Sequence, residues 1–249
     1  RAYIKIQDGC NQFCSYCIIP YARGRIRSRK TEDILAEIKG LVKEGCREVV
    51  LTGIHISSYG LDRGESELLH LIQSIHEIDL VERIRLGSLE PRIITPEMAA
   101  SFAALPKLCP HFHLSLQSGC DLTLSRMNRH YTSQEYAEGV RLLRSVYDNP
   151  AITTDVIVGF PGETQEEFEE SKDFLEKIAF YEVHVFKYSI RKGTAAAKFP
   201  GQLTDNQKSQ RSDVLLQITR KQAHQYRENF IGEKVKVLWE DTETIDGQI

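Results

Sequence analysis

The chain has 249 residues, of which 41% are hydrophobic and 27% are charged, and its formal net charge is −3 at pH 7. This composition excludes a disordered tail, a mini-protein and a membrane-spanning enzyme, because no apolar run approaches the ~18 residues that a bilayer requires. Six cysteines are too few for a disulfide scaffold. Because no hydrophobic signal segment opens the chain, we expect a reducing, cytoplasmic compartment in which these cysteines are thiols or metal ligands.

Strand and helix patterns alternate along most of the chain. Strands are expected over 3–6, 48–52, 83–88, 111–116, 152–158 and 181–188. Helices are expected over 31–44 and 65–78, from 95 onward, over 133–147 and 164–178, and from 204 to about 230, the last two opened by capping boxes. Such alternation predicts the α/β class, with right-handed βαβ units and a mostly parallel sheet. Six units fall short of a complete barrel, so we expect a partial, open (β/α)6 barrel, with an open doubly wound sheet as the alternative.

Both ends of the chain suggest that it is part of something longer. The first residue is Arg1 rather than Met, and a strand is expected almost at once. At the other end, residues 232–239 predict a strand that opens a new element before the chain stops at Ile249. We therefore expect one core domain over 1–231 and the truncated start of a small second domain over 232–249.

Three cysteines follow the first expected strand, at the strand end where folds of this class place their chemistry. Cys10, Cys14 and Cys17 are separated by three and then two residues. Three thiolates on one loop can reach three corners of a cubane iron-sulfur cluster and leave one iron open to a small molecule. Structural zinc is the alternative, but it needs a fourth ligand and usually paired knuckles, which this chain lacks. The remaining cysteines stand alone and are expected to be structural; they are Cys46, Cys109 and Cys120.

The CxxxCxxC loop, with Tyr16 before its last cysteine, resembles the signature of the radical S-adenosylmethionine (SAM) enzymes. The resemblance implies a 4Fe-4S cluster on Cys10, Cys14 and Cys17, which are then catalytic through the cluster. It further implies that the methionine amine and carboxylate of SAM bind the open iron, and that an electron from the cluster cleaves SAM to a 5'-deoxyadenosyl radical. It also implies a partial (β/α)6 barrel, in agreement with the strand pattern.

A narrower resemblance, to the methylthiotransferases, covers nearly the whole chain. The stretches that carry it are 8–11, 17–24, 28–29, 51–55, 113–119, 127–129 and 155–163. Within that family, 20–24, 52–55 and 89–91 look most like the branch that adds a methylthio group to C2 of N6-threonylcarbamoyladenosine at tRNA position 37. The isopentenyladenosine branch and the ribosomal-protein branch remain alternatives, as does a non-enzymatic iron-sulfur or zinc module that binds RNA.

The methylthiotransferase resemblance also implies further parts and partners. The family has an N-terminal domain with a second 4Fe-4S cluster on three further cysteines, and a C-terminal RNA-binding β-barrel, the TRAM domain. Residues 232–249 would begin that barrel, and no residue before Arg1 supplies the second cluster. We therefore expect this chain to cleave SAM without completing sulfur insertion and to bind the tRNA anticodon loop weakly. A low-potential electron donor and a sulfur donor are the other expected partners.

Polar and glycine residues at the expected strand ends are candidates for holding SAM. They are Gly53, Ser88, Glu90, Gln117, Asp155 and Gly159, together with Tyr16 in the cysteine loop and Arg129 after the fourth strand. The resemblance places Gly53 at the methionine amine. We interpret the loop that begins at Gly159 as a backbone contact to the adenine, and we expect one of the basic residues 126, 129 and 130 to meet the carboxylate. For each, a structural role as turn glycine or supporting polar residue is the alternative.

Basic residues near the cysteine loop are candidates for contacting RNA. The alternation Arg23, Arg25, Arg27, Arg29 has period two, so an extended segment would point all four guanidinium groups to one side. Such a stripe suits RNA phosphates, and a solvated run of charges is the alternative. Tyr188 lies in another basic group after the sixth strand, where it either stacks on an unpaired base or belongs to the core.

Overall fold

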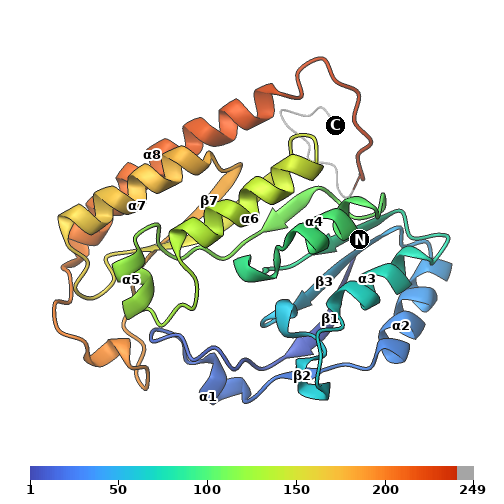
Figure 1. The fold of residues 1–249 in the computed structure, drawn as a ribbon, viewed down its shortest axis with the longest axis horizontal. Coiled ribbons are helices and arrows are strands. Elements are labelled where there is room, and N and C mark those ends of the chain that lie inside the picture. The colour runs from blue at the N-terminus through green and yellow to red at the C-terminus, as the bar shows by residue number, and fades with distance from the viewer. Residues whose placement is uncertain (240–249) are drawn as a thin grey trace, which may run out of the picture.

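A computed structural model describes residues 1–239 of the chain as an open parallel sheet with helices along it (Figure 1). The strands are β1 (Ala2–Asp8), β2 (Arg27–Ser28), β3 (Glu48–Gly53), β4 (Arg83–Leu86), β5 (His111–His113), β6 (Ala151–Val158) and β7 (Glu182–Lys187). The helices are α1 (Ile19–Arg23), α2 (Thr31–Lys43), α3 (Leu68–His76), α4 (Pro96–Ala103), α5 (Asp121–Arg126), α6 (Ser133–Val146), α7 (Gln165–Ile178) and α8 (Asp205–Glu228). No helix in the described part of the chain is both long and apolar enough to cross a membrane.

The six predicted strands pair in sequence order. One sheet has the order β2-β1-β3-β4 and the other β5-β6-β7, and only the short β2 runs antiparallel to its neighbour. Parallel bridges from Ile84 to Leu108 and from Leu89 to Leu114 carry the order from β4 to β5. A sequential order has no reversal point, which a doubly wound sheet requires. Since β7 does not pair with β1 or β2 among residues 1–239, the partial open barrel is confirmed.

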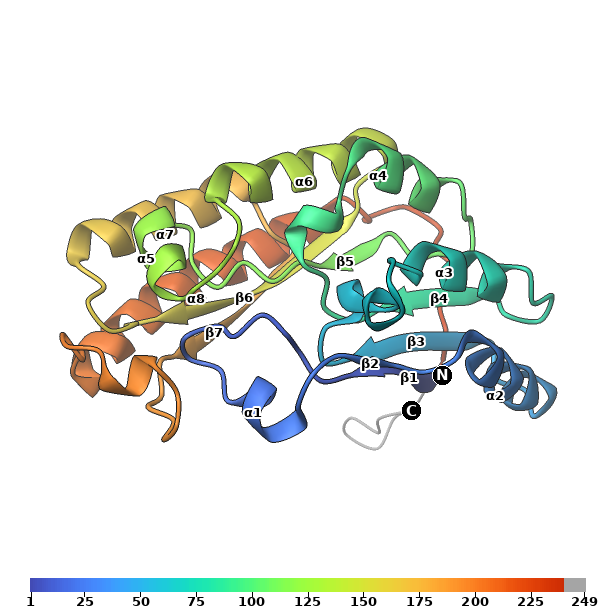
Figure 2. The ribbon, with the colours of Figure 1, turned by 60° about the horizontal axis from the view of Figure 1, so that its bottom comes forward.

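The two faces of the strands differ in chemistry. On β6, Ile152, Val156 and Val158 lie in the main hydrophobic core. In Figure 2, helices α3, α4, α6 and α7 run along one side of the strands. Because strand side chains alternate, Asp155 and Ile157 lie on the opposite, inner face, where both are half-buried. The predicted capping boxes at the starts of α7 and α8 are both present.

The structure adds three short elements that the periodicity did not predict: α1, β2 and α5. Each is too short to show a hydrophobic period. The third and fourth predicted strands are also shorter than expected, ending at Leu86 and His113.

The strand predicted over 232–239 is wrong for residues 233–239, which form no strand. A strand needs hydrogen-bonding partners, and no described strand pairs with this segment. Its apolar side chains Val235, Val237 and Trp239 are therefore largely exposed. The rest of the predicted second domain, residues 240–249, lies outside the described residues, so that domain stays a prediction.

Gly9 fixes the point where β1 turns into the cysteine loop. Its φ is +72°, and a Cβ there would lie 1.9 Å from the carbonyl oxygen of Arg25. The Cys10 amide donates to the neighbouring Gly24 carbonyl over 3.1 Å, so two stretches of backbone meet without room for a side chain. Glycine is required here because it has no Cβ and adopts positive φ without strain.

We expect Gly9→Ala to lower the free energy of unfolding by at least about 2 kcal/mol. An alanine at this positive φ is strained, and its Cβ would also displace the backbone at Arg25. Gly40→Ala is the matched control: Gly40 lies within α2, and a Cβ there meets nothing within 4 Å. Replacing a helical glycine by alanine should raise stability by roughly 0.5–1 kcal/mol. Urea unfolding followed by circular dichroism measures both changes. Equal stability of the two variants would contradict the packing described.

Candidate active site

The cysteine loop lies between β1 and α1, and all six cysteines of the chain are free thiols. Cys14 is buried, whereas Cys10 and Cys17 are half-buried. Burial raises the pKa of Cys10 and of Cys17, and repulsion from neighbouring thiolates on the same loop raises each further. All three thiols lie within residues 10–17 of one loop. A set of three thiols on one loop fits a cubane cluster with one iron left without a protein ligand.

The turn after α5 holds the cysteine loop in place. The Ser15 amide donates to the Met127 carbonyl over 3.0 Å, and the Ser15 hydroxyl donates to the Arg126 carbonyl over 2.7 Å. Asn128 donates through Nδ2 to the Phe13 carbonyl over 3.0 Å. Both Phe13 and Asn128 have positive φ, so two sharp turns face each other. Ser15 and Asn128 were not singled out from the sequence as site residues, although each lies within or beside a motif that was.

Arg129 is the basic residue of this turn that faces the cysteines. Its Nη1 donates to Cys14 Sγ over 3.2 Å, and its Nε donates to the Tyr131 hydroxyl over 3.0 Å. Burial alone lowers the pKa of Arg129, but Tyr131, Tyr16 and Cys14 raise it above its ordinary value. The guanidinium therefore stays charged. Arg126 instead forms an ion pair with Glu167, so Arg129 is the basic residue of this turn that lies against a cysteine sulfur.

A cavity of about 510 Å³ opens beside the cysteine loop. Its lining includes Tyr16, Cys17, Gln117, Asp155, Tyr188 and Arg191. Gln117 has φ +71°, and its amide donates to the Asp155 carbonyl over 2.8 Å. Burial raises the pKa of Tyr16, so its hydroxyl is neutral. The volume lies in the range of sites for small molecules and cofactors. The structure thus brings together three predicted cofactor residues, at positions 16, 117 and 155.

Aromatic side chains close one side of this cavity. Phe160 is fully buried and packs edge-to-face against Tyr16 and Tyr188, with ring centroids 6.4 Å and 5.3 Å away. Tyr188 is 4% exposed, so its ring belongs to this cluster rather than to an open stacking platform. The interpretation of Tyr188 as a core residue is therefore the correct one.

Glu90 is the centre of a polar network at the end of β4. Its carboxylate accepts from Arg92 Nε over 2.5 Å and from Gln12 Nε2 over 3.2 Å, and it lies 3.5 Å from His55 Nε2. Burial raises the pKa of Glu90, but hydrogen bonds from His55 and Arg92 outweigh it and lower the pKa to about 2. Through Gln12, this carboxylate ties the cysteine loop to the strand ends.

The other predicted cofactor residues lie outside the lining of this cavity. Gly53 and Ser88 are exposed at the ends of their strands. A Cβ on Gly53 would lie 2.9 Å from the Gln7 carbonyl oxygen, so the position is tightly packed. The Gly159 amide donates to the Glu163 carboxylate over 2.7 Å, and a Cβ there would lie 2.4 Å from Lys208 Cγ. This amide is thus already occupied within the protein.

The extended arginine stripe is wrong. Arg23 ends α1, and Gly24 turns the chain with φ +77°. The four guanidinium groups consequently do not form one stripe: Arg23 and Arg27 lie 3.9 Å and 3.6 Å from the Asp8 carboxylate, Arg25 lies 4.9 Å from the Phe13 ring centroid, and Arg29 pairs with Glu37. A period-two pattern carries no information where a helical turn and a glycine interrupt it.

We expect Glu90→Gln to destabilise the fold in a pH-dependent way. A folded-state pKa of about 2 against 4.5 for the free group corresponds to about 3 kcal/mol at most. Because the folded pKa is depressed, this stabilisation is present above pH ~4.5 and is lost as the pH falls toward 2. Urea unfolding at pH 7 and pH 3.5 should show a larger difference from wild type at pH 7. Glu77→Gln, at a side chain 83% exposed, is the control and should change little.

Comparisons with known proteins agree with this geometry. The family model described as the Radical SAM superfamily matches residues 4–175. Solved structures share the fold: the radical S-adenosylmethionine methyltransferase TsrM from Kitasatospora setae aligns with a TM-score of 0.66 at 20% identity, over 79% of this chain and 38% of that one.

Curated relatives align over nearly all of this chain. The tRNA-2-methylthio-N(6)-dimethylallyladenosine synthase of Pelotomaculum thermopropionicum is 40% identical over 96% of this chain and 54% of its own length. The threonylcarbamoyladenosine tRNA methylthiotransferase MtaB of Thermotoga maritima is 41% identical over 96% of this chain and 55% of its own length. The chain thus spans about half the length of the curated relatives it matches.

Two independent findings therefore coincide, a three-cysteine loop beside a cavity at the strand ends and a family match that begins at β1 and extends into α7. The chain belongs to the radical SAM superfamily.

Proposed function

We propose that this chain is the catalytic core of a tRNA methylthiotransferase that modifies C2 of N6-threonylcarbamoyladenosine at position 37. The observation that carries the proposal is the three-cysteine loop, whose last cysteine, Cys17, lines the 510 Å³ cavity. Sequence motifs at 20–24, 52–55 and 89–91 and the relatives named threonylcarbamoyladenosine methylthiotransferases support the substrate. Relatives named dimethylallyladenosine synthases are equally similar, which makes dimethylallyladenosine the second candidate.

Cys10, Cys14 and Cys17 would hold the cluster, which together with SAM would supply the radical chemistry. The chain's own residues orient and shield this chemistry. Arg129 places a fixed positive charge against the Cys14 sulfur, where thiolate charge develops when metal binds. Phe160 and the neighbouring tyrosines exclude water from one side of the cavity, which protects a reactive intermediate.

We assign the SAM contacts among the predicted residues by their position. Tyr16, Gln117 and Asp155 line the cavity, so these three are best placed for direct contact. Arg129 lies outside that lining, against the Cys14 sulfur, and would act from the cluster side. Glu90 is held in its polar network and acts by supporting the loop through Gln12. Gly53 and Ser88 would contribute only through backbone or edge contacts, whereas the amide of Gly159 is already bonded to Glu163 and leaves only its carbonyl for such a contact.

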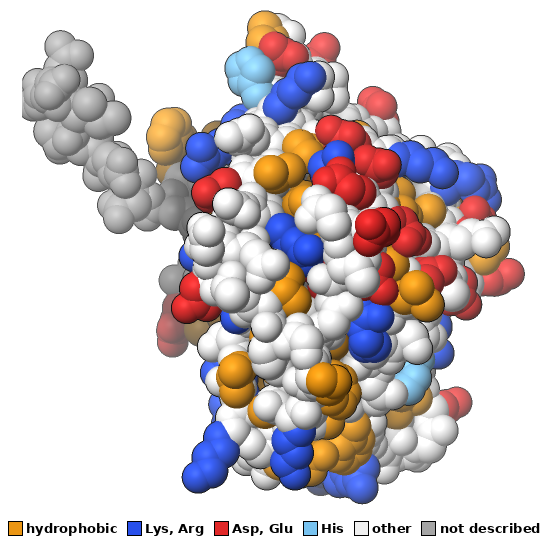
Figure 3. Space-filling view, turned by 90° about the vertical axis from the view of Figure 1, so that its left-hand side faces the viewer, with side chains coloured by type: hydrophobic (Ala, Val, Ile, Leu, Met, Phe, Trp, Pro, Cys, Tyr) orange, Lys and Arg blue, Asp and Glu red, His pale blue; other side chains and the backbone are white. Residues whose placement is uncertain are grey.

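The anticodon loop would approach the end of the molecule that carries α1 and the segment after β7. In Figure 3, acidic side chains lie mainly on the upper part of the face, while the lower end carries lysine, arginine and hydrophobic side chains. Arg23, Arg25 and Arg27 are exposed, and Lys187 and Arg191 lie at the cavity. Cationic side chains grouped at the opening of the cavity would attract RNA phosphates and make RNA binding dependent on salt concentration.

The full-length protein would add the parts that the methylthiotransferase resemblance implies. We propose residues 1–231 as the radical SAM core and residues 232–249 as the start of a TRAM-like domain. A second 4Fe-4S cluster, a sulfur donor and a low-potential electron donor belong to the proposal for the complete enzyme, which would act on tRNA in the cytoplasm.

The cluster assignment is tested by anaerobic reconstitution of the chain. We expect about four irons per chain and release of 5'-deoxyadenosine from SAM with dithionite, measured by iron assay and chromatography. Cys14→Ser should abolish both. Cys46→Ser should abolish neither, because Cys46 does not belong to the cysteine loop and its thiol donates to the Glu48 carbonyl over 3.2 Å. Bound zinc with substoichiometric iron would contradict the enzyme assignment and favour a binding module.

The substrate is tested in a strain that lacks the gene for the full-length protein. Nucleoside mass spectrometry of its tRNA should show loss of the 2-methylthio form of N6-threonylcarbamoyladenosine, restored by the wild-type gene and not by its Cys10→Ala version. Loss of 2-methylthio-N6-dimethylallyladenosine alone would transfer the assignment to the second candidate. Unchanged methylthio-adenosines would refute a tRNA substrate and favour a ribosomal-protein side chain.

A further inference from the structure

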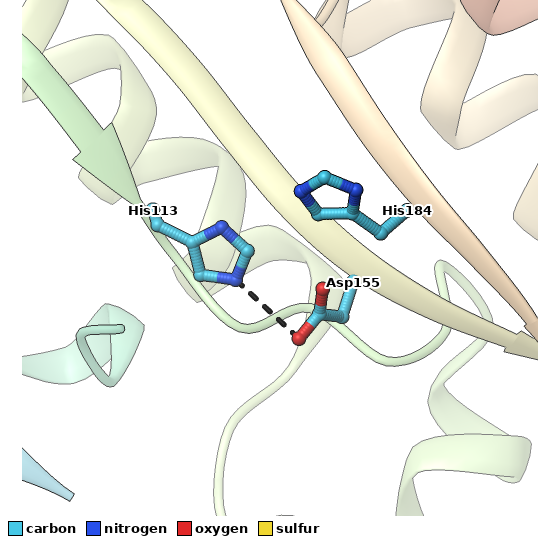
Figure 4. Close-up of side chains that lie close together, drawn as sticks. All are labelled: His113, Asp155 and His184. Atoms are coloured by element: carbon cyan, nitrogen blue, oxygen red, sulfur yellow. Dashed lines mark ion pairs between the residues drawn. The ribbon is translucent and has the colours of Figure 1, made fainter. Parts of the chain in front are cut away.

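Two histidines and a carboxylate converge on the inner face of the second sheet. His113 ends β5, Asp155 lies within β6, and His184 lies within β7. In the parallel register, Asp155 is paired with His184, and His113 is paired with Thr153, two residues before Asp155 on the same face. Figure 4 shows the three side chains gathered over neighbouring strands. Three strands therefore present one nitrogen or oxygen ligand each to a common point.

The spacing of these ligand atoms suits a metal ion. All three lie within 4.8 Å of one another, and His113 Nε2 is 3.4 Å from Asp155 Oδ2. Two ligands of a tetrahedral ion with bonds of about 2.0–2.1 Å lie roughly 3.4 Å apart, so this pair already has the required separation. His184 is exposed, so rotation of its side chain can close the remaining gap.

His113 is oriented for coordination by a partner on its other nitrogen. Its Nδ1 lies 3.0 Å from Thr153 Oγ1, while Nε2 is buried and has no hydrogen-bond partner among the described residues. When Nδ1–H donates to Thr153, Nε2 presents its lone pair toward Asp155. A second hydrogen bond of this kind is typical of histidines that ligate metals. A buried nitrogen without a partner is costly unless something binds it.

The charges around the cluster also favour a cation. Among residues 1–239, His113 is the only basic residue within ion-pair distance of the Asp155 carboxylate, so no lysine or arginine neutralises it. Two imidazoles and one carboxylate match zinc, iron(II), cobalt or nickel, and suit magnesium or calcium poorly because those ions prefer oxygen ligands. Since Asp155 also lines the 510 Å³ cavity, a coordination position not filled by protein would face that cavity.

We propose that His113, Asp155 and His184 bind one divalent transition-metal ion of the zinc class beside the cavity, at the point where Asp155 lines it. This inference uses none of the cluster cysteines and stands whether or not the proposed methylthiotransferase activity is correct. The ion would join β5, β6 and β7 and leave a site for water or for an oxygen atom of a ligand.

The test separates this site from the cysteines, which bind the same metals. The chain carrying Cys10→Ser, Cys14→Ser and Cys17→Ser is titrated with Co²⁺ and followed by visible absorption, with circular dichroism to verify folding. We expect one Co²⁺ per chain. Adding His113→Ala or His184→Ala should weaken binding at least tenfold, whereas His224→Ala, at an exposed side chain on α8, should not.

Two further measurements keep the outcome decisive. His184→Cys in the same background should retain Co²⁺ and add a thiolate-to-cobalt charge-transfer band, which identifies position 184 as a ligand. In parallel, the cluster-loaded wild-type chain, equilibrated with Zn²⁺ and desalted, should retain one zinc by elemental analysis and lose it in His113→Ala. Substoichiometric binding in both experiments, or binding that is the same in the His113 and His184 variants as in the His224 variant, would overturn the proposal.

Discussion

The site depends on the set of hydrogen bonds between the cysteine loop and the turn at residues 126–129. In an open barrel, the first and last strands do not pair, so no ladder links the loop after β1 to the second sheet. Ser15 and Asn128 supply that link through backbone carbonyls, and Arg129 supplies it through the Cys14 sulfur. In a closed barrel, strand pairing would hold this loop, whereas here side-chain hydrogen bonds fix the position of the three sulfurs relative to the ends of β5 and β6.

This link is made of groups that are expensive to bury alone. Arg129 loses hydration in its buried position, and its pKa stays high because Tyr131, Tyr16 and Cys14 surround it. Its ring contact with Tyr131, at 4.8 Å from the centroid, and the hydrogen bond to the Tyr131 hydroxyl compensate part of that cost. An uncompensated buried charge is strongly destabilising. The cation and the cysteines are therefore coupled, because loss of the sulfur would leave Arg129 with fewer partners in the same low-dielectric place.

The sequence predicts the outer part of this molecule well and the inner part less well. Strands and helices that pack in the core have a hydrophobic period, as the buried Ile152 and Val156 of β6 show. The order of these elements can therefore be predicted from the sequence, and that order indicates the open barrel. The cysteine loop is predictable because its spacing is specific. The arginine segment is not, because Gly24 and the short α1 break the period that the interpretation assumed. Glu90 is found as a strand-end carboxylate, but its bond to Gln12 joins residues 78 positions apart and has no local signal.

The two faces of each strand explain why errors fall on the inner side. Outward side chains must be apolar to pack against helices, and this requirement produces a hydrophobic period that can be recognised in the sequence. The inner-face side chains His113, Asp155 and His184 do not pack against helices, and Asp155 lines the cavity, so core packing does not dictate their residue type. Their meeting depends on register: a slip of one residue between β6 and β7 would turn His184 outward, into the position that Val183 or Val185 occupies against the core. Val183, which is buried, and Val185, which is partly buried, thus keep His184 on the inner face, and core packing on one face specifies the chemistry on the other.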